Sequence, residues 1–200
     1  NGIDFEKFSP KNNISRTIGQ IITTASADVP LKGLDFTLHA IAALVKDFPH
    51  LRLIIIGAPR IGGHTERLIQ KLKIEANIVY KTNLSKEEIA IEYASSNIAI
   101  VSSLYEGFGF PVGEAMACSI PLIATNVASI PEITGNFAEL IPACDSKSIE
   151  RSIRNILSNP AKYQSRADKG RQHIIDNFDW KKIAQSYENL IYQTMENFKC

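Results

Sequence analysis

Short apolar runs alternate with helical patterns along this chain, and this alternation constrains its fold more than any other feature. The run LRLIIIG at 51–57 is apolar at nearly every position and ends in glycine. Strands that lack a regular polar face are covered on both sides, as in a parallel sheet flanked by helices. The predicted fold class is therefore α/β: a doubly wound parallel sheet, helices on both faces and a helical C-terminal tail.

The expected strands occupy 17–25, 51–57, 77–82, 97–103, 121–125 and 138–143, and the expected helices occupy 33–48, 64–74, 84–96, about 111–118, about 146–158, 160–177 and 180–197. Ser85 followed three residues later by Glu88 is a capping-box pattern, typical of a helix start. No repeat or linker-like segment interrupts the alternation, so we expect one Rossmann-like domain over 1–200, with the tail helix at 178–200. Because the chain begins with Asn1 rather than Met, we expect it to be part of a longer protein.

Composition excludes several classes of protein. The net charge of +1 argues against a nucleic-acid partner, which needs a dense basic face. No apolar run reaches the roughly 20 residues of a transmembrane helix, so we expect a cytoplasmic protein, with any peripheral membrane contact made by a further domain. The three cysteines, Cys118, Cys144 and Cys200, are far apart and form no metal-ligand spacing, which suits a reducing compartment.

The strand order predicts where a ligand would bind. In doubly wound folds, ligands lie outside the carboxyl ends of the strands, where the strand order reverses. With the order 3-2-1-4-5-6, the first and fourth strands are neighbours, and the loops at 26–33 and 104–111 leave them side by side. We therefore expect Lys32 and Glu106 to face each other across one crevice.

The second of these loops, EGFGFPVGE at 106–114, has the chemistry of an anion site. Glycines 107 and 109 permit unusual backbone angles and leave N–H groups uncovered, and the helix expected after them adds a favourable dipole. We expect Glu114, in the first helical turn, to project toward the same opening and to accept hydrogen bonds from a ribose diol. Glu106 would hold a further hydroxylated group, and Lys32 a diphosphate. Together these groups indicate a nucleotide-sugar.

Simpler readings of the same residues remain open. Two glutamates eight residues apart occur by chance in most proteins, and Glu114 is equally well read as a surface acid that complements a helix dipole. Phe108 and Phe110 are more often core residues than ligand-stacking ones. Only the whole combination of glycines, proline and acids in this loop is a specific indication of a ligand-binding site.

The segment at 103–121 resembles the retaining group 1 glycosyltransferases of the GT-B fold. It reads S-x-x-E-G-F-G-x-P-x-x-E-A-M-A-x-x-x-P. Further matching pieces are NGID at the start, LKG at 31–33, IPEI at 130–133 and FDW at 178–180. The resemblance implies half of a GT-B fold, the C-terminal domain that binds the sugar donor.

The resemblance also implies roles for individual residues. Glu106 would lie beside the donor sugar and Lys32 on the diphosphate, so these two are the expected catalytic residues. The expected donor-binding residues are Glu114, Gly107, Phe108, Gly109, Phe110, Thr82 and Leu84, with Glu114 on the ribose and Thr82 to Leu84 near the base. The donor would be a UDP-, GDP- or ADP-linked sugar, bound as a substrate; no cofactor and no metal are expected.

The resemblance further implies a partner domain. A carbohydrate or lipid-linked acceptor would bind to an N-terminal domain that this chain lacks, so we expect the isolated chain to be inactive in transfer. The last helices would pack on that other half. Without it, they would leave an apolar face exposed.

One departure from the family pattern leaves a second function open. Members of the family pair the lysine with an arginine five residues earlier, where this chain has Ala27; Arg60 is a candidate substitute. A non-catalytic module that binds nucleotide-sugars is the alternative hypothesis. A dehydrogenase is disfavoured because no G-x-G-x-x-G follows the first strand.

Overall fold

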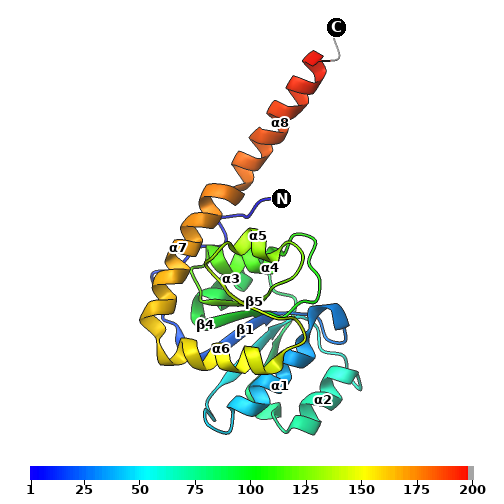
Figure 1. Ribbon diagram of the computed structural model, residues 1–200. Helices are drawn as coiled ribbons and strands as arrows, with labels where there is room; N and C mark the ends of the chain where they lie inside the picture. Colours follow the sequence, from blue (N-terminus) through cyan, green and yellow to red (C-terminus); the bar gives the residue numbers. More distant parts are fainter. Residues whose placement is uncertain (198–200) are drawn as a thin grey trace.

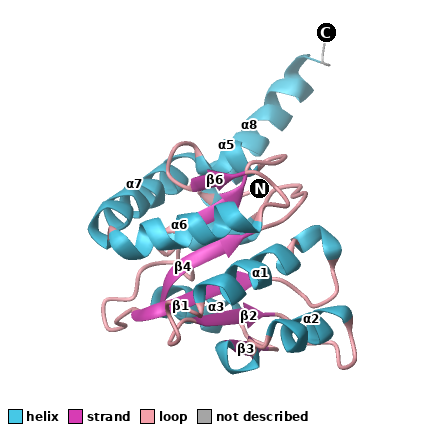
Figure 2. Ribbon diagram, turned by 60° about the horizontal axis from the view of Figure 1, so that its bottom comes forward, coloured by secondary structure: helices cyan, strands magenta, loops and turns pink. Residues whose placement is uncertain are grey.

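The computed structural model, described over residues 1–197, is a six-stranded parallel sheet with helices on both faces (Figures 1 and 2). The strand order is β3-β2-β1-β4-β5-β6, which confirms the predicted order. The strands are β1 (Thr17–Thr24), β2 (Arg52–Ile56), β3 (Ile78–Lys81), β4 (Ser96–Val101), β5 (Leu122–Thr125) and β6 (Glu139–Ile141).

The helices follow the predicted alternation. They are α1 (Leu34–Leu44), α2 (His64–Leu72), α3 (Lys86–Ser95), α4 (Phe110–Ala117), α5 (Ile130–Thr134), α6 (Ser146–Ser158), α7 (Pro160–Phe178) and α8 (Trp180–Asn197), with short 3-10 helices η1 (Pro30–Lys32) and η2 (Glu75–Asn77). The capping box is confirmed, because Ser85 and Glu88 each bond the other's backbone N–H. The short helix α5 was not predicted, since its five residues are too few for a periodic pattern.

Two apolar clusters hold the layers together. Helices α1, α2 and α6 cover one face through residues such as Leu38, Ile69 and Ile153, and they lie on the same side of the sheet in Figure 2. Helices α3, α4 and α5 cover the other face, with Tyr93 and Val112 in its centre. Because both faces are covered, the strands are apolar on both sides, as the sequence predicted.

The N-terminal segment lies against the junction of α7 and α8. The backbone N–H of Ile3 donates to the carbonyl oxygen of Phe178 at 2.8 Å. From there α8 projects away from the sheet (Figure 1). Residues 198–200, the last part of the predicted tail helix, lie outside the described residues. Across residues 1–197, no helix is long and apolar enough to cross a membrane.

The loops that follow β1 and β4 are tied together by their backbones. The N–H of Leu104 donates to the carbonyl oxygen of Leu31 at 2.8 Å. The hydroxyl of Ser102 donates to the carbonyl oxygens of Lys32 at 3.1 Å and of Gly33 at 3.0 Å. Gly33 has a φ of +61°, and a Cβ there would collide with the carbonyl oxygen of Ser102. Only glycine allows the two loops to approach this closely.

We expect Gly33→Ala to destabilise the protein by about 2 kcal/mol or more, because it combines a left-handed backbone angle with a backbone clash. Gly107→Ala is the matched control. A Cβ at Gly107 meets open space, so its free energy of unfolding should change by less than about 1 kcal/mol. Urea denaturation of both variants measures the difference. Equal losses in the two variants would contradict the proposed constraint at Gly33.

Candidate functional site

Lys32 and Glu106 form an ion pair at the carboxyl ends of β1 and β4. Lys32 Nζ lies 2.7 Å from Glu106 Oε1, and the side chains are 32% and 11% exposed. The structure thus brings the two residues into contact, as the strand order predicted. Because the pair is partly shielded from water, its attraction is stronger than that of an exposed pair.

The carboxylate of Glu106 is held by its own loop and by the neighbouring strand. The hydroxyl of Ser103 donates to Glu106 Oε1 at 2.7 Å. The hydroxyl of Thr125, at the end of β5, donates to the carbonyl oxygen of Ser103 at 2.5 Å, and that of Ser129 to the carbonyl oxygen of Glu106 at 2.9 Å. Glu106 is therefore fixed in both its side chain and its backbone.

The glycine loop leads from Glu106 into α4. Gly109, with a φ of +83°, is the N-cap residue, and no side chain caps the helix. Pro111 occupies the second helical position, where its missing N–H costs nothing. The N–H groups of Val112 and Gly113 donate to the carbonyl oxygen of Gly109, so the start of α4 offers an anion chiefly its positive dipole end.

The two phenylalanines of the loop behave differently. Phe108 is partly buried against the core, and its ring centroid lies 4.9 Å from that of Phe110 and 6.0 Å from that of Phe178. Phe110 is 48% exposed and lines a cavity beside α4. Phe108 therefore anchors the loop with its side chain, while its backbone is the part near the predicted anion site.

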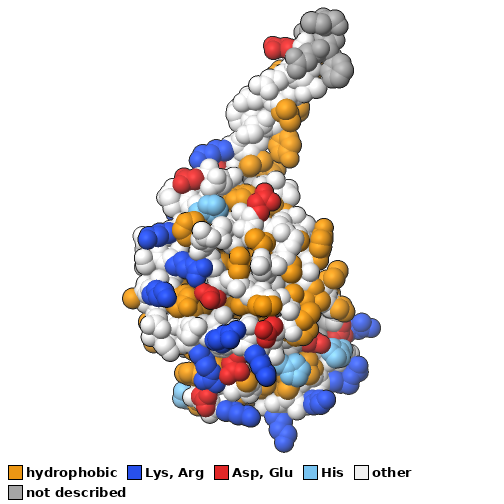
Figure 3. Space-filling model, viewed as in Figure 1, with side chains coloured by type: hydrophobic (Ala, Val, Ile, Leu, Met, Phe, Trp, Pro, Cys, Tyr) orange, Lys and Arg blue, Asp and Glu red, His pale blue; other side chains and the backbone are white. Residues whose placement is uncertain are grey.

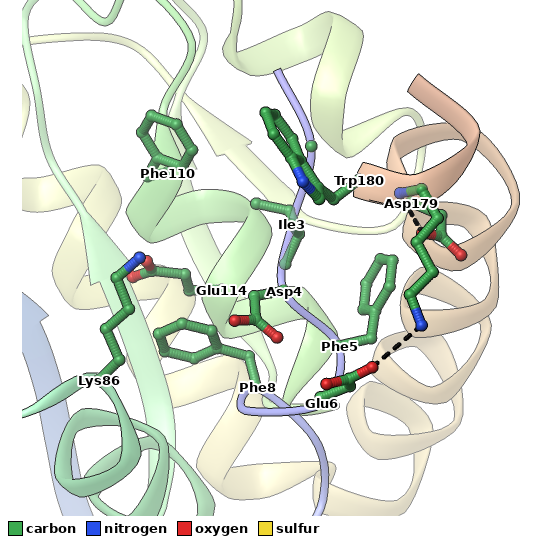
Figure 4. Close-up of a pocket in the computed structure, with 12 residues that line it drawn as sticks. Ile3, Asp4, Phe5, Glu6, Phe8, Lys86, Phe110, Glu114, Asp179 and Trp180 are labelled. Atoms are coloured by element: carbon green, nitrogen blue, oxygen red, sulfur yellow. Dashed lines mark hydrogen bonds and ion pairs between the residues drawn. The ribbon is translucent and has the colours of Figure 1, made fainter. Parts of the chain in front are cut away.

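Glu114 lines the same cavity, of about 470 Å³, together with Lys86 and Phe110 (Figure 4). It is the fifth residue of α4 and lies in the second turn, so its predicted place in the first turn was wrong. Burial raises the pKa of the Glu114 carboxyl to about 7, against the opposing effect of the Lys86 ammonium. A half-buried carboxyl with a raised pKa that lines a cavity is a candidate ligand-binding group.

The far wall of this cavity was not predicted from the sequence. It comes from the N-terminal segment and from the start of α8, which contribute Asp4, Phe5, Phe8 and Trp180 among others. Asp4 and Trp180 belong to the NGID and FDW pieces of the sequence, but only the contact between the N-terminal segment and the junction of α7 and α8 brings them near Glu114. Lys86 was missed because it follows the capping serine, where a lysine is unremarkable in sequence.

Thr82 and Leu84 follow the end of β3. Thr82 is exposed, and Leu84 packs partly against the core. They precede Lys86, whose side chain reaches the cavity. β3 ends at Lys81, one residue before the predicted end of this strand, so the segment is a loop.

The expected second cation is absent from position 27. The N–H of Ala27 donates to the carbonyl oxygen of Ala58 at 3.3 Å. Arg60 is 73% exposed, and its Nε lies 3.8 Å from the carboxylate of Asp28. That carboxylate also accepts from the N–H groups of His64 and Thr65 at the start of α2. In this structure Arg60 is thus paired with a helix-capping acid rather than with the Lys32 and Glu106 pair.

A family model for glycosyl transferases group 1 matches residues 4–173. This chain belongs to that family. An MMP alpha-(1->4)-mannosyltransferase from Mycolicibacterium hassiacum is 36% identical to this chain over 187 residues, which are 92% of the chain and 44% of the relative. A D-inositol 3-phosphate glycosyltransferase from Streptomyces bingchenggensis is 24% identical over 99% of the chain and 48% of the relative. The chain spans about half the length of the curated relatives it matches.

Solved structures share the fold. Sucrose-phosphate synthase from Thermosynechococcus elongatus superposes with a TM-score of 0.88 at 24% identity, covering 98% of the chain and 52% of that protein. The C-terminal domain of a glycosyl transferase group 1 family protein from Francisella tularensis gives 0.76 at 23% identity, over 90% of the chain and all of that domain. The Rossmann-like half of a GT-B fold, predicted from the sequence, is confirmed.

We expect Glu114→Gln to stabilise the protein at high pH. A carboxyl whose folded pKa lies near 7 rather than at 4.5 prefers its protonated form when folded, so its contribution to stability is present below about pH 4.5 and is lost as the pH rises to 7. The difference corresponds to at most about 3 kcal/mol. At pH 8 the variant should exceed the wild type in free energy of unfolding by up to that amount, and at pH 5 by much less.

Urea denaturation between pH 5 and pH 8 measures this difference. Glu75→Gln, an exposed acid in η2 at the other edge of the sheet, is the matched control and should show no such trend. A difference between Glu114→Gln and wild type that stays constant with pH would show that burial does not raise the pKa of Glu114.

Proposed function

We propose that this chain is the donor-binding domain of a retaining, metal-independent hexosyltransferase that uses a nucleotide-diphospho-sugar. The observation that carries the proposal is the ion pair of Lys32 and Glu106 near the start of α4, whose later residue Glu114 is half-buried. Glu114 lines a cavity together with Phe110, and neither Lys32 nor Glu106 lines that cavity. Group 1 membership supports the proposal. A structural neighbour from Anabaena was solved in complex with UDP-glucose, which supports the proposal that a fold of this kind binds a sugar donor.

The proposed chemistry is the loss of a diphosphate leaving group. As the bond from the anomeric carbon to the diphosphate breaks, negative charge builds up on the phosphate oxygens. Lys32 and the N-terminus of α4 would stabilise that charge, and such preorganised electrostatic stabilisation is usually the largest catalytic effect. We propose that the stabilisation rests on these protein groups rather than on a metal ion.

Each remaining residue has a proposed binding role. Glu106 would accept hydrogen bonds from hydroxyl groups of the donor sugar, and Glu114 from the ribose diol. The N–H groups of the glycine loop at 107–110 would bind the phosphates and the sugar, and the loop at 82–84 would lie beside the base. The acceptor, a carbohydrate or a lipid-linked group, would bind to a separate N-terminal domain.

A second function, binding without transfer, is favoured by one observation. Position 27 carries alanine, and Arg60 contacts Asp28, so one diphosphate cation expected from the family is not supplied by either residue in this structure. A nucleotide-sugar-binding module with no catalysis would show this pattern. Turnover by the full-length protein decides between the two.

We expect the chain to bind a sugar nucleotide in calorimetric titrations with UDP-glucose, GDP-mannose and ADP-glucose. Glu114→Ala should weaken that binding about ten-fold or more, because a lost charged hydrogen bond costs about 1.5–3 kcal/mol. Glu75→Gln serves as the control and should bind like the wild type. No heat with any donor at millimolar concentration would contradict the donor-site assignment.

In the full-length protein, Lys32→Met should lower kcat about 100-fold or more, as expected when one group that stabilises developing charge is removed. Glu106→Ala should abolish transfer as well. A wild-type protein that binds the donor yet transfers no sugar would favour the binding module. Normal turnover that Glu106→Ala abolishes would exclude it.

We further propose that α8 packs on the other half of the full-length protein. Its apolar side chains form one stripe at helical spacing, and they are exposed here (Figure 3): Trp180, Tyr187, Leu190, Ile191 and Met195. Such a stripe is typical of a helix that covers another surface.

We expect the isolated chain to self-associate through this stripe. Replacing Leu190 and Ile191 by lysine should yield a monomer with an unchanged midpoint of urea unfolding, because both side chains are exposed. Light scattering at increasing concentration measures the association. A strict monomer in the wild-type chain, with α8 protected in hydrogen exchange, would contradict the proposal.

A further inference from the structure

The ion pair at the candidate site joins two residues with different proposed ligands. Lys32 is proposed to bind the diphosphate and Glu106 the donor sugar, yet Lys32 Nζ contacts Glu106 Oε1 at 2.7 Å. The same oxygen accepts a hydrogen bond from Ser103 at 2.7 Å. A ligand must therefore compete with Glu106 for the Lys32 ammonium, and with Lys32 for the Glu106 carboxylate.

Separating the pair has a cost that depends on the ligand. Glu106 is 11% exposed, and a shielded carboxylate that loses its cation is strongly destabilised, because little water can replace the lost contact. A free nucleoside diphosphate that draws Lys32 away leaves Glu106 with the Ser103 hydroxyl alone. It also brings phosphate charge near that carboxylate, which adds repulsion.

An intact nucleotide-sugar avoids this cost. Its diphosphate attracts Lys32, and the hydroxyl groups of its sugar donate hydrogen bonds to the carboxylate that Lys32 releases. Hydrogen bonds to a charged acceptor are among the stronger ones in proteins. One molecule then serves both halves of the separated pair.

We propose that the ion pair of Lys32 and Glu106 makes the site select an intact nucleotide-sugar over the free nucleoside diphosphate. This inference rests on the proposed function of the site. The inference adds a specificity that the separate roles of Lys32 and Glu106 do not imply. The free nucleotide must break the ion pair, and it offers the Glu106 carboxylate no new hydrogen-bond donor. It therefore binds less tightly than its phosphate contacts alone would allow.

The backbone around the pair supports an exchange confined to side chains. The N–H of Leu104 is bonded to the carbonyl oxygen of Leu31, and the Ser102 hydroxyl to the carbonyl oxygen of Lys32. The loops on both sides of the crevice are thus joined at their backbones. Lys32 has the flexible stem needed to swing from the carboxylate to a phosphate while its loop stays in place.

The test is Glu106→Gln, which keeps the size of the side chain and removes the charge that holds Lys32. Calorimetric titrations use UDP, GDP and ADP, and the matching UDP-glucose, GDP-mannose and ADP-glucose. We expect the variant to bind the free nucleotide about three- to ten-fold tighter than the wild type, because Lys32 is released, and to lose most of the preference for the sugar form. Glu114→Gln should instead weaken both forms alike, since both carry the ribose.

A double-mutant cycle with Lys32→Met separates the ion pair from simple repulsion. If Glu106→Gln acts by releasing Lys32, its gain in nucleotide affinity disappears in the Lys32→Met background. A gain that persists there would show that Glu106 only repels phosphate, and would overturn the inference. Binding of both ligand forms with no gain in Glu106→Gln would also overturn it, while leaving the proposed donor site intact. Absence of binding by the wild type would instead contradict the proposed function itself.

Discussion

The pairing of β1 with β4 is the constraint on which the candidate site depends. These strands are separated by more than 70 residues in sequence, yet they lie side by side in the centre of the sheet, with Ile21 opposite Ile98 and Ile22 opposite Ala99. Their following loops therefore emerge at one edge, and a single glycine at position 33 lets the loop backbones touch. Apolar packing on both faces fixes this pairing, and the polar site is a consequence of it.

Glu114 lowers the stability of the folded domain near neutral pH, and its proposed role in ligand binding would account for this cost. Burial raises the pKa of its carboxyl, which means that the folded domain is destabilised by the charged form near neutral pH. A residue chosen for packing alone would be apolar in this place. The cost is understandable if the carboxylate becomes hydrogen-bonded when a hydroxylated ligand enters the cavity, because the ligand then supplies the partners that burial removes.

Sequence reasoning was most reliable where a pattern repeats over short distances. The strand order and the helix capped by Ser85 are confirmed, and the facing of Lys32 and Glu106 followed from strand order alone. It was wrong on the helical turn of Glu114, because the start of α4 is displaced by one residue from the expected position. It gave no role to Ser103, whose hydroxyl holds Glu106, although a serine three residues before an acid in a turn was a usable signal.

Residue types at short, fixed spacings are enough to predict the α/β alternation, the glycine loop and the family. The tertiary structure adds that Lys32 pairs with Glu106, that Glu114 is half-buried, and that Trp180 and the N-terminal segment line the cavity beside it. Charge pairing and desolvation depend on which groups meet through space. Those neighbours come from segments far apart in the chain, so no local pattern records them.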